Sequence, residues 1–364
     1  MLILYVFIAV VVINCGFYLL FSKFSFLKSS EKTVGTTPPV SLIVCAKNEE
    51  ENLKRNIPLL LKQDYPNFEL ILINDASSDE SLEVMEAFAE TDPRIQIVNV
   101  KNNEAFWANK KYALTLGIKR AKNERLLFTD ADCKPSSSSW LRIMTSHFSE
   151  EKQLILGYGA YEKGKGLLNK LIRFETLMTA TQYFSYAKAG IPYMGVGRNL
   201  GFTSTLYYSI NGYMSHIKVP SGDDDLFVNE AGTAQNTAIC FDENAFTYSL
   251  PKKKWQDWKM QKRRHITTSK LYKTKHKLLL GTYYFTNLLF WILMIVTLML
   301  MDWKIPVIII AFRFIVQFVT VGMAAYKLKE KDLVPFIPFL ELFLVFIQLI
   351  IFISNRFSKP PQWK

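Results

Sequence analysis

The sequence predicts an α/β domain with a mostly parallel sheet, joined to one N-terminal and about three C-terminal transmembrane helices. Two patterns predict it: strand-like apolar runs alternate with amphipathic runs in the middle of the chain, and four long apolar runs flank that middle. The 364 residues are 49% hydrophobic with a net charge of +12, too apolar for a disordered chain and too basic for an average soluble enzyme. Membrane lipids are therefore the first expected partner.

Each of the four apolar runs is long enough to cross a bilayer, which takes about 20 apolar residues. Residues 1–22 form the first run, and the lack of a following small-residue cleavage site predicts a retained anchor. Arg313 and Glu341 are the only charges inside the other three runs, so buried helices of a soluble protein are the disfavoured alternative. Those runs are residues 278–301, 305–325 and 333–354, which together predict a C-terminal transmembrane region over 278–355.

The basic residues cluster just before the second apolar run. Residues 252–277 hold eleven Lys or Arg and one acid, Asp257. With Trp255 and Trp258 interleaved, residues 251–277 are typical of an amphipathic segment in the membrane interface, where anionic headgroups attract basic side chains. A nucleic-acid binder usually spreads its basic residues over a folded face, so we expect no nucleic-acid partner.

Basic residues also predict the orientation, because Lys and Arg beside membrane helices tend to stay in the cytoplasm. The basic segment and the lysines after the first run place residues 23–277 in the cytoplasm, in a protein of the cell (inner) membrane. These lysines are Lys23, Lys28 and Lys32.

The C-terminal tail disagrees with this orientation. Three ordinary crossings after residue 277 would place its basic residues outside, namely Arg356, Lys359 and Lys364. Either the rule fails here, or the last apolar run, which contains Pro335 and Pro338, is re-entrant or interfacial.

The middle of the chain alternates strand-like and helix-like runs. The strand-like runs are residues 40–46, 68–74, 95–100 and 125–129, and the helix-like runs are 49–62, 78–89 and 108–121. Repeated strand-helix-strand units predict a parallel sheet with helices on both faces, whose ligands bind at the carboxyl ends of the strands. Polar residues gather at those ends: Lys47, Asn48, Glu49, Asn74, Asp75, Asp130 and Asp132. Turns favour Asn and Asp at any one position, but three such groups at one edge favour a binding site.

Asp130 and Asp132 follow a buried strand directly. Two carboxylates at the ligand edge suit a hard divalent cation such as Mg²⁺ or Mn²⁺, which would neutralise a diphosphate leaving group. The alternative is an Asp-rich helix cap. The four cysteines show no paired spacing, so the sequence indicates neither a disulfide framework nor a zinc site.

A second acidic cluster contains Asp223, Asp224 and Asp225. Adjacent carboxylates repel one another, which raises their proton affinity and suits one of them to act as a general base. A solvated loop is the alternative, but the apolar run from Leu226 predicts that the cluster opens a packed helix.

Two further segments bear on the site. Arg264 offers a planar fork that matches phosphate oxygens, so we assign Arg264 and Gln261 to the site and the rest of the basic segment to the membrane. The spacing in residues 195–201 is one residue too long for a dinucleotide loop, which leaves a glycine-rich loop near a sugar or acceptor, or a plain turn.

As an ordered set, these motifs resemble the membrane-bound family-two glycosyltransferases, which have a GT-A fold. That family includes processive polysaccharide synthases and ceramide glucosyltransferases, and the resemblance covers about residues 39–265. Its motifs lie here at residues 40–51, 73–79, 110–114, 129–132, 223–226 and 261–264. The resemblance implies a cytoplasmic catalytic domain over 39–250 that takes a UDP-sugar as donor.

The resemblance also implies a role for each site residue. Asn48 or Glu49 and Asp75 would hold the uracil and ribose, and Lys110 or Lys111 would lie near the nucleotide. Asp130 would contact the nucleotide and Asp132 the metal. Asp223 would be the base within the cluster that includes Asp224, and Gln261 and Arg264 would steady the diphosphate. The expected reaction is an inverting transfer to a lipid or cell-envelope glycan precursor.

Two departures from the family pattern bear on the acceptor. His265 stands where the family has Trp, and Gly222 stands where Glu usually precedes the base. Because the aromatic residue shapes the acceptor entrance in polysaccharide synthases, its replacement disfavours a processive exopolysaccharide synthase and favours transfer of one sugar to a lipid. An inactive membrane scaffold of the same fold is a further alternative, which intact Asp132, Asp223 and Arg264 disfavour.

Overall fold

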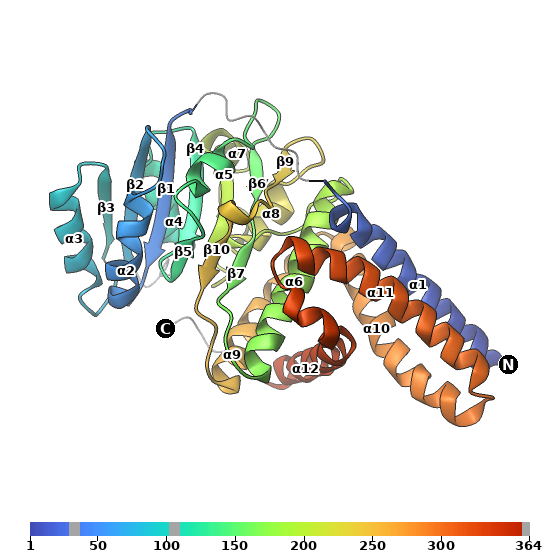
Figure 1. The fold of residues 1–364 in the computed structure, drawn as a ribbon. Coiled ribbons are helices and arrows are strands. Elements are labelled where there is room, and N and C mark those ends of the chain that lie inside the picture. The colour runs from blue at the N-terminus through green and yellow to red at the C-terminus, as the bar shows by residue number, and fades with distance from the viewer. Residues whose placement is uncertain (29–36, 102–109, 359–364) are drawn as a thin grey trace. The chain divides into compact units, whose positions relative to one another are not determined.

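The computed structural model describes residues 1–28, 37–101 and 110–358, and Figure 1 shows its fold. The expectations for Lys32, Lys359 and Lys364, and for the first two residues of the helix predicted from 108, lie outside the described residues. The chain divides into two compact units. The helical unit combines Met1–Lys28, Lys163–Ala189 and Lys252–Pro361, whereas the sheet unit contains Ser29–Glu162 and Gly190–Pro251.

The sheet unit is built on a mixed, mostly parallel sheet of seven strands in the order β3-β2-β1-β4-β8-β6-β9. Strands β1 to β4 are mutually parallel, while β8 runs antiparallel to β4 and β6. The strands are β1 Val40–Ala46, β2 Phe68–Asp75, β3 Ile95–Val100, β4 Arg125–Asp130, β6 Leu154–Leu156, β8 Leu200–Thr203 and β9 Thr237–Ile239. The first four confirm the strands predicted from the sequence. A smaller sheet joins β5 (Cys133–Pro135), β10 (Thr247–Ser249) and β7 (Gly159–Tyr161) in that order.

Helices cover both faces of the large sheet. Successive side chains of a strand point to opposite faces, so each face offers apolar side chains on which helices can pack. Leu42 and Val44 of β1 belong to the same buried cluster as Leu53 of α2 and Met85 of α3. On the opposite face Gly117 lets α4 approach closely, since a Cβ there would lie 2.2 Å from Ile73. The helices of this unit are α2 Glu50–Leu61, α3 Ser81–Thr91, α4 Lys110–Arg120, α5 Trp140–Thr145, α7 Ser204–Ser209 and α8 Asp225–Ala231, with 3-10 turns η1 Gly197–Asn199, η2 Met214–His216 and η3 Glu243–Ala245.

The strand register brings the predicted site residues to one edge. Ala46 of β1 pairs with Asn74 of β2, and Cys45 pairs with Asp130 of β4. Because these strands are parallel, the polar residues that follow them emerge at the same end of the sheet.

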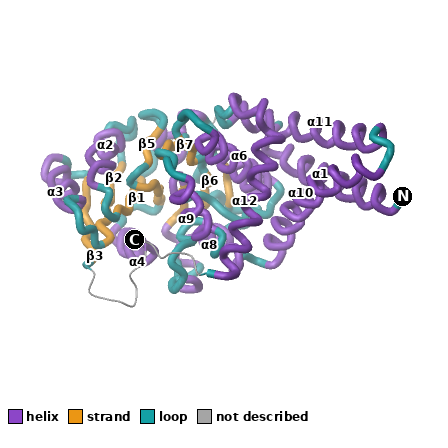
Figure 2. The backbone as a smooth tube through the Cα atoms, turned by 90° about the horizontal axis from the view of Figure 1, so that it is seen from below, coloured by secondary structure: helices purple, strands orange, loops and turns teal. Residues whose placement is uncertain are grey.

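The helical unit contains four helical segments long and apolar enough to cross a membrane, as predicted: Leu2–Ser25, Thr274–Leu300, Lys304–Lys327 and Lys331–Phe357. Helix α1 (Leu2–Ser25) packs between α10 (Thr274–Leu300) and α11 (Lys304–Lys327), where the ring centroids of Phe21 and Tyr283 are 5.2 Å apart. Figure 2 shows these three helices side by side. The unit also contains α6 Leu167–Lys188, α9 Trp255–His265, η4 Thr268–Leu271, η5 Lys331–Phe336 and α12 Ile337–Phe357.

The sheet unit differs from the predicted 39–250 domain by the segment that contains α6. The rings of Phe184 of α6 and Phe24 of α1 pack in a tilted arrangement with centroids 4.9 Å apart, and the Ser185 hydroxyl donates to the carbonyl of Phe21 at 3.0 Å. The apolar face of α6 is thus buried against the N-terminal helix. This packing explains why α6 belongs to the helical unit although it lies inside the predicted domain.

Candidate active site

The two acidic motifs of the sequence meet at one lysine. Lys110, the first residue of α4, places its ammonium nitrogen 2.7 Å from an Asp130 carboxylate oxygen and 3.1 Å from one of Asp223. The three side chains border a small pocket beyond the end of β4. Its polar lining consists of Lys110, Thr129, Asp130, Tyr213, Asp223 and Asp224.

The paired lysine sets the charge of Asp223. Burial alone would raise the pKa of this carboxyl, but the Lys110 ammonium outweighs it and lowers the pKa below its usual value. Asp223 is therefore a carboxylate at neutral pH, which is the form in which a base can accept a proton.

Asp224 has a different environment from its neighbour. Its two carboxylate oxygens accept the backbone N–H groups of Gly197 and Asp225, each at 2.7 Å, so it caps the N-terminus of α8. Burial, with Asp223 and Asp225 nearby, raises the pKa of Asp224 to about 7. The like-charge effect expected from the sequence thus acts on Asp224, and the expected packed helix after the cluster is confirmed.

Asp130 and Asp132 form a candidate metal site with Cys133, since one ligand atom from each lies within 4.8 Å of the others. The Cys133 sulfur lies 2.9 Å from the Ser249 hydroxyl and 3.3 Å from an Asp132 oxygen. Burial raises the pKa of the Cys133 thiol, and a sulfur is a softer ligand than the hard divalent cations prefer. Two carboxylates remain, and this oxygen set fits Mg²⁺ or Mn²⁺ better than zinc.

Arg198 is a charged residue of this region that the sequence did not identify. Its guanidinium carbon lies 4.2 Å from the centre of the Tyr161 ring, and Nη1 donates to the Ala160 carbonyl at 3.0 Å. The negative groups that interact with this cation include Asp132 and Asp130, so it adds positive charge beside the candidate metal ligands. The flanking glycines of residues 195–201 were the only sequence signal, and they suggested backbone chemistry instead.

Asn48 and Glu49 lie between β1 and α2 and hydrogen-bond to residues that follow β2. Asn48 adopts a positive φ of 56°, and its side-chain oxygen accepts the Ser78 N–H at 2.8 Å. The Glu49 N–H donates to the Ser81 hydroxyl at 2.9 Å. These bonds fix both predicted nucleotide residues at the sheet edge.

Asp75 ends β2 at the same edge and is buried. Its burial raises the pKa, while Lys47 and Lys110 act in the opposite direction. Lys110 therefore interacts electrostatically with side chains at the ends of β1, β2 and β4, which are Cys45, Asp75 and Asp130.

Of the two candidate lysines, Lys110 reaches the site and Lys111 points elsewhere. The Lys111 ammonium donates to the carbonyls of His216 at 2.8 Å and Val219 at 3.2 Å. It thereby holds the segment that precedes the second acidic cluster, which makes it a positioning residue for Asp223.

Gln261 and Arg264 lie on α9 of the helical unit. A neighbouring residue of α9, Lys262, forms an ion pair with Glu175 of α6 at 2.7 Å. The assignment of Gln261 and Arg264 to the diphosphate stays a prediction.

Comparison with known proteins identifies the sheet unit. Residues 41–204 match the family described as Glycosyl transferase family 2, so the chain carries a domain of this family, as the motifs predicted. The 4,4'-diaponeurosporenoate glycosyltransferase of Staphylococcus haemolyticus is 28% identical over 136 residues, which cover 37% of this chain and 35% of the relative. The poly-beta-1,6-N-acetyl-D-glucosamine synthase of Staphylococcus epidermidis is 30% identical over 112 residues, which cover 31% and 25%. The chain thus spans only about a third or less of these relatives' lengths.

A solved structure supports the GT-A fold. It is the mannosyltransferase PcManGT from Pyrobaculum calidifontis in complex with GDP-Man and Mn²⁺, with a TM-score of 0.58 and 16% identity, covering 88% of this chain and 98% of that one. At this identity the likeness concerns the fold.

Proposed function

We propose that the protein is an inverting glycosyltransferase that moves one sugar from a UDP-sugar to a membrane-associated acceptor, a lipid or a cell-envelope glycan precursor. The observation that carries the proposal is the position of Lys110 between Asp130 and Asp223. A site of this kind has carboxylates for a divalent cation at one end and an ionised carboxylate at the other. A metal-assisted inverting transfer uses the first to neutralise the departing diphosphate and the second to accept the acceptor's proton.

Each residue would have one task. Asn48, Glu49 and Asp75 would bind the base and ribose at the sheet edge, with Asp130 beside the nucleotide. Asp130 and Asp132 would hold Mg²⁺ or Mn²⁺, which supplies charge neutralisation to the departing diphosphate. Gln261 and Arg264 would bind the same phosphates.

Asp223 would accept the proton of the acceptor hydroxyl as its oxygen attacks the anomeric carbon from the face opposite the UDP. Lys110 would keep Asp223 ionised before the reaction. The proton therefore moves from the acceptor oxygen to a carboxylate, and the electron pair of the broken bond leaves with the UDP.

The membrane helices support a lipid or membrane-proximal acceptor. We propose that the sheet unit is cytoplasmic, where nucleotide sugars are made, and that the basic segment 251–277 lies against anionic headgroups. The Staphylococcus haemolyticus relative, named for a 4,4'-diaponeurosporenoate acceptor, agrees with a lipid-like acceptor.

The second candidate is a processive polysaccharide synthase, and the similarity to the poly-beta-1,6-N-acetyl-D-glucosamine synthase favours it. A processive enzyme needs a path for its polymer, which few membrane helices after the catalytic unit would have to provide. His265 in place of the family's Trp also disfavours it.

One experiment separates these functions. Membranes containing the protein are incubated with a panel of radiolabelled UDP-sugars and with GDP-mannose, and the lipid-soluble product is separated from the polymer. We expect lipid-soluble label from a UDP-sugar, and none from membranes that carry Asp223→Asn. Polymeric product would support the processive alternative, and label equal to the Asp223→Asn control with every donor would contradict a transferase.

A further inference from the structure

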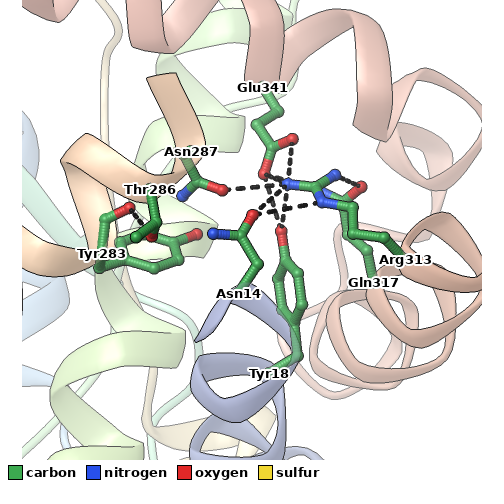
Figure 3. Close-up of polar contacts among 8 residues, drawn as sticks. All are labelled: Asn14, Tyr18, Tyr283, Thr286, Asn287, Arg313, Gln317 and Glu341. Carbon is green, nitrogen blue, oxygen red and sulfur yellow. Dashed lines mark hydrogen bonds and ion pairs between the residues drawn. The ribbon is translucent and has the colours of Figure 1, made fainter. Parts of the chain in front are cut away.

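The two charges inside the C-terminal apolar runs form an ion pair in the helical unit. Arg313 of α11 and Glu341 of α12 are both buried, and their charged groups are 2.8 Å apart. Arg313 also donates to Tyr18 of α1 at 2.8 Å and to Asn287 of α10 at 3.0 Å. Figure 3 shows this network around the Arg313 guanidinium. The pair holds the start of α12 beside the α1, α10 and α11 bundle.

The chain enters α12 from a turn that is tied to the start of α6. Helix α11 ends at Lys327, and Lys329 follows with a left-handed φ of 60°. Arg173 of α6 then binds the carboxylates of Glu330 and Asp332, the latter at 2.7 Å. Pro335 lies in the 3-10 turn η5 before α12, and Pro338 lies in the first turn of α12, where a helix needs no N–H from it.

The far end of α12 is tied to α9. Arg263 donates to the Asn355 side-chain oxygen at 2.8 Å, and Asn355 donates back to the Arg263 carbonyl at 2.9 Å. Helix α9 is in turn paired to α6 through Lys262 and Glu175. The entry to α12 is therefore tied to α6 and its far end to α9, and the two anchors meet where Lys262 pairs with Glu175, two residues from Arg173.

Between these ends α12 crosses α10 instead of running along it. One α10 residue, Tyr284, donates to the Val345 carbonyl at 3.2 Å and lies 5.3 Å from the Phe352 ring. Two helices that run side by side would contact each other through successive turns of both helices, whereas here one residue of α10 contacts residues two turns apart on α12. Figures 1 and 2 agree, since α12 runs across the direction of α1, α10 and α11.

We propose that α12 lies in the membrane interface on the side that holds α9, so that the chain crosses the bilayer three times and its C-terminus stays on the same side as α9. A crossing helix must have its ends about 30 Å apart across the hydrocarbon layer. The anchor of the entry to α12 at Arg173 and the anchor of its far end at Arg263 both lie beside residues 173–175 of α6, which argues against ends that far apart. The proposal does not depend on the transferase reaction.

The surface of α12 fits a lipid partner. Phe339, Phe346 and Ile353 recur every seven residues, so they share one face, and they are 48%, 41% and 50% exposed. This apolar face can enter the acyl boundary while Lys259 of α9, with Lys252 and Lys253 just before that helix, faces anionic headgroups.

The proposal also resolves the charge conflict of the tail. With α12 in the interface, Arg356 remains on the side of the basic segment 252–277. Arg356 then follows the positive-inside tendency, as Lys23, Lys28 and the segment 252–277 do.

The first test compares reporter fusions in cells. Green fluorescent protein, which fluoresces in the cytoplasm, and alkaline phosphatase, which is active outside, are each fused after Lys364 or inserted between Asp302 and Trp303, in the connection of α10 and α11. We expect fluorescence from the C-terminal fusion and phosphatase activity from the insertion. Phosphatase activity from the C-terminal fusion would overturn the proposal.

The second test measures depth along the helix and needs no inserted domain. After Cys15→Ala and Cys45→Ala, which remove the two partly exposed cysteines, spin labels are placed through Phe339→Cys, Phe346→Cys or Ile353→Cys in vesicles containing anionic lipid. Collision with oxygen and with a water-soluble nickel complex reports the depth of each label.

The matched control is α11, whose exposed residues Phe312, Val319 and Tyr326 have the same spacing. Seven residues of a crossing helix span about 10 Å, so depth should change steadily along α11. The three α12 labels should lie at nearly one shallow depth. A gradient along α12 equal to that of α11 would overturn the proposal.

Discussion

The ammonium group of Lys110 lies 3.1 Å from the carboxylate of Asp223, so a cation from the start of α4 forms an ion pair with the acidic residue that we propose as the base. The same nitrogen lies 2.7 Å from Asp130. One lysine therefore joins two acidic motifs that are far apart in the sequence, and it keeps the proposed base charged inside a buried site.

Asp223→Asn should abolish turnover while leaving donor binding within a few fold. The base acts in the chemical step, so its loss lowers kcat more than affinity. Calorimetry on detergent-solubilised protein would measure UDP-sugar binding beside the assay. Asp224→Asn should be milder, because Asn remains a good helix cap. Normal turnover of Asp223→Asn with an inactive Asp224→Asn would move the base by one residue.

Lys110→Met should shift the acidic limb of the kcat profile to higher pH. In the wild type the pKa of Asp223 is lowered, so the base stays ionised as pH falls toward that low value. Without the ammonium, burial is uncompensated and the pKa rises, so kcat should fall more at about pH 6 than at about pH 8. Lys119→Met, at an exposed position of the same helix, is the control. Parallel profiles for both variants would show that Lys110 does not set the charge.

Asp224 should make the folded state less stable as pH rises. Its pKa is raised to about 7, so the folded protein binds a proton that the unfolded chain releases near its ordinary value of 3.8. Stability therefore falls between those values as pH increases. The melting temperature of the wild type should drop more between about pH 5 and pH 8 than that of Asp224→Asn. Equal drops would contradict the assignment.

Asp132→Ala should lower turnover by at least about a hundredfold, the scale of one lost preorganised electrostatic contact. Excess chelator should have a similar effect on the wild type, and Mn²⁺ or Mg²⁺ should restore activity. Asp64→Ala, at an exposed position of the same unit, should remain active. Full activity in chelator would mean that Asp130 and Asp132 are structural.

Gly159→Ala should weaken the site through Arg198. A Cβ at residue 159 would lie 2.9 Å from the Arg198 Cβ, so the arginine must shift. We expect Arg198→Met to lower kcat/KM by about tenfold or more, the scale of one charge-assisted hydrogen bond, and Gly159→Ala to act in the same direction. Gly281→Ala, where a Cβ meets nothing within 4 Å, is the control. Wild-type kinetics for both variants would remove Arg198 from the site.

Arg313→Met alone should destabilise the solubilised protein by about 3–5 kcal/mol, because it leaves the Glu341 carboxylate buried without its partner. The double variant with Glu341→Met should lose less, since it leaves no buried charge. Thermal denaturation in detergent would compare the two. A double variant that is less stable than the single one would contradict this expectation, since Glu341 would then stabilise the bundle without Arg313 through its bonds to Tyr18 and Gln317.

The sequence predicted the four main strands and the edge at which polar residues gather, because alternation and turn chemistry are local properties. It could not separate Lys110 from Lys111, since only the start of α4 decides which side chain faces Asp223. Asp224 acts as a cap through a bond to Gly197, and Arg198 is positioned by Tyr161. The two members of each pair are far apart in the sequence. The charge conflict of the tail is visible in the sequence, but the proposal that addresses it rests on the contacts of Asn355, which no sequence pattern shows.

The interleaving of the two units along the chain has a practical consequence for protein production. Because α6 is encoded between two parts of the sheet unit, no single truncation yields the sheet unit alone. A soluble fragment over residues 39–250 would carry α6 with Phe184 and Tyr186 stripped of their α1 partners. Such a fragment should aggregate, whereas replacing residues 163–189 with a short polar linker offers a route to crystals of the catalytic half.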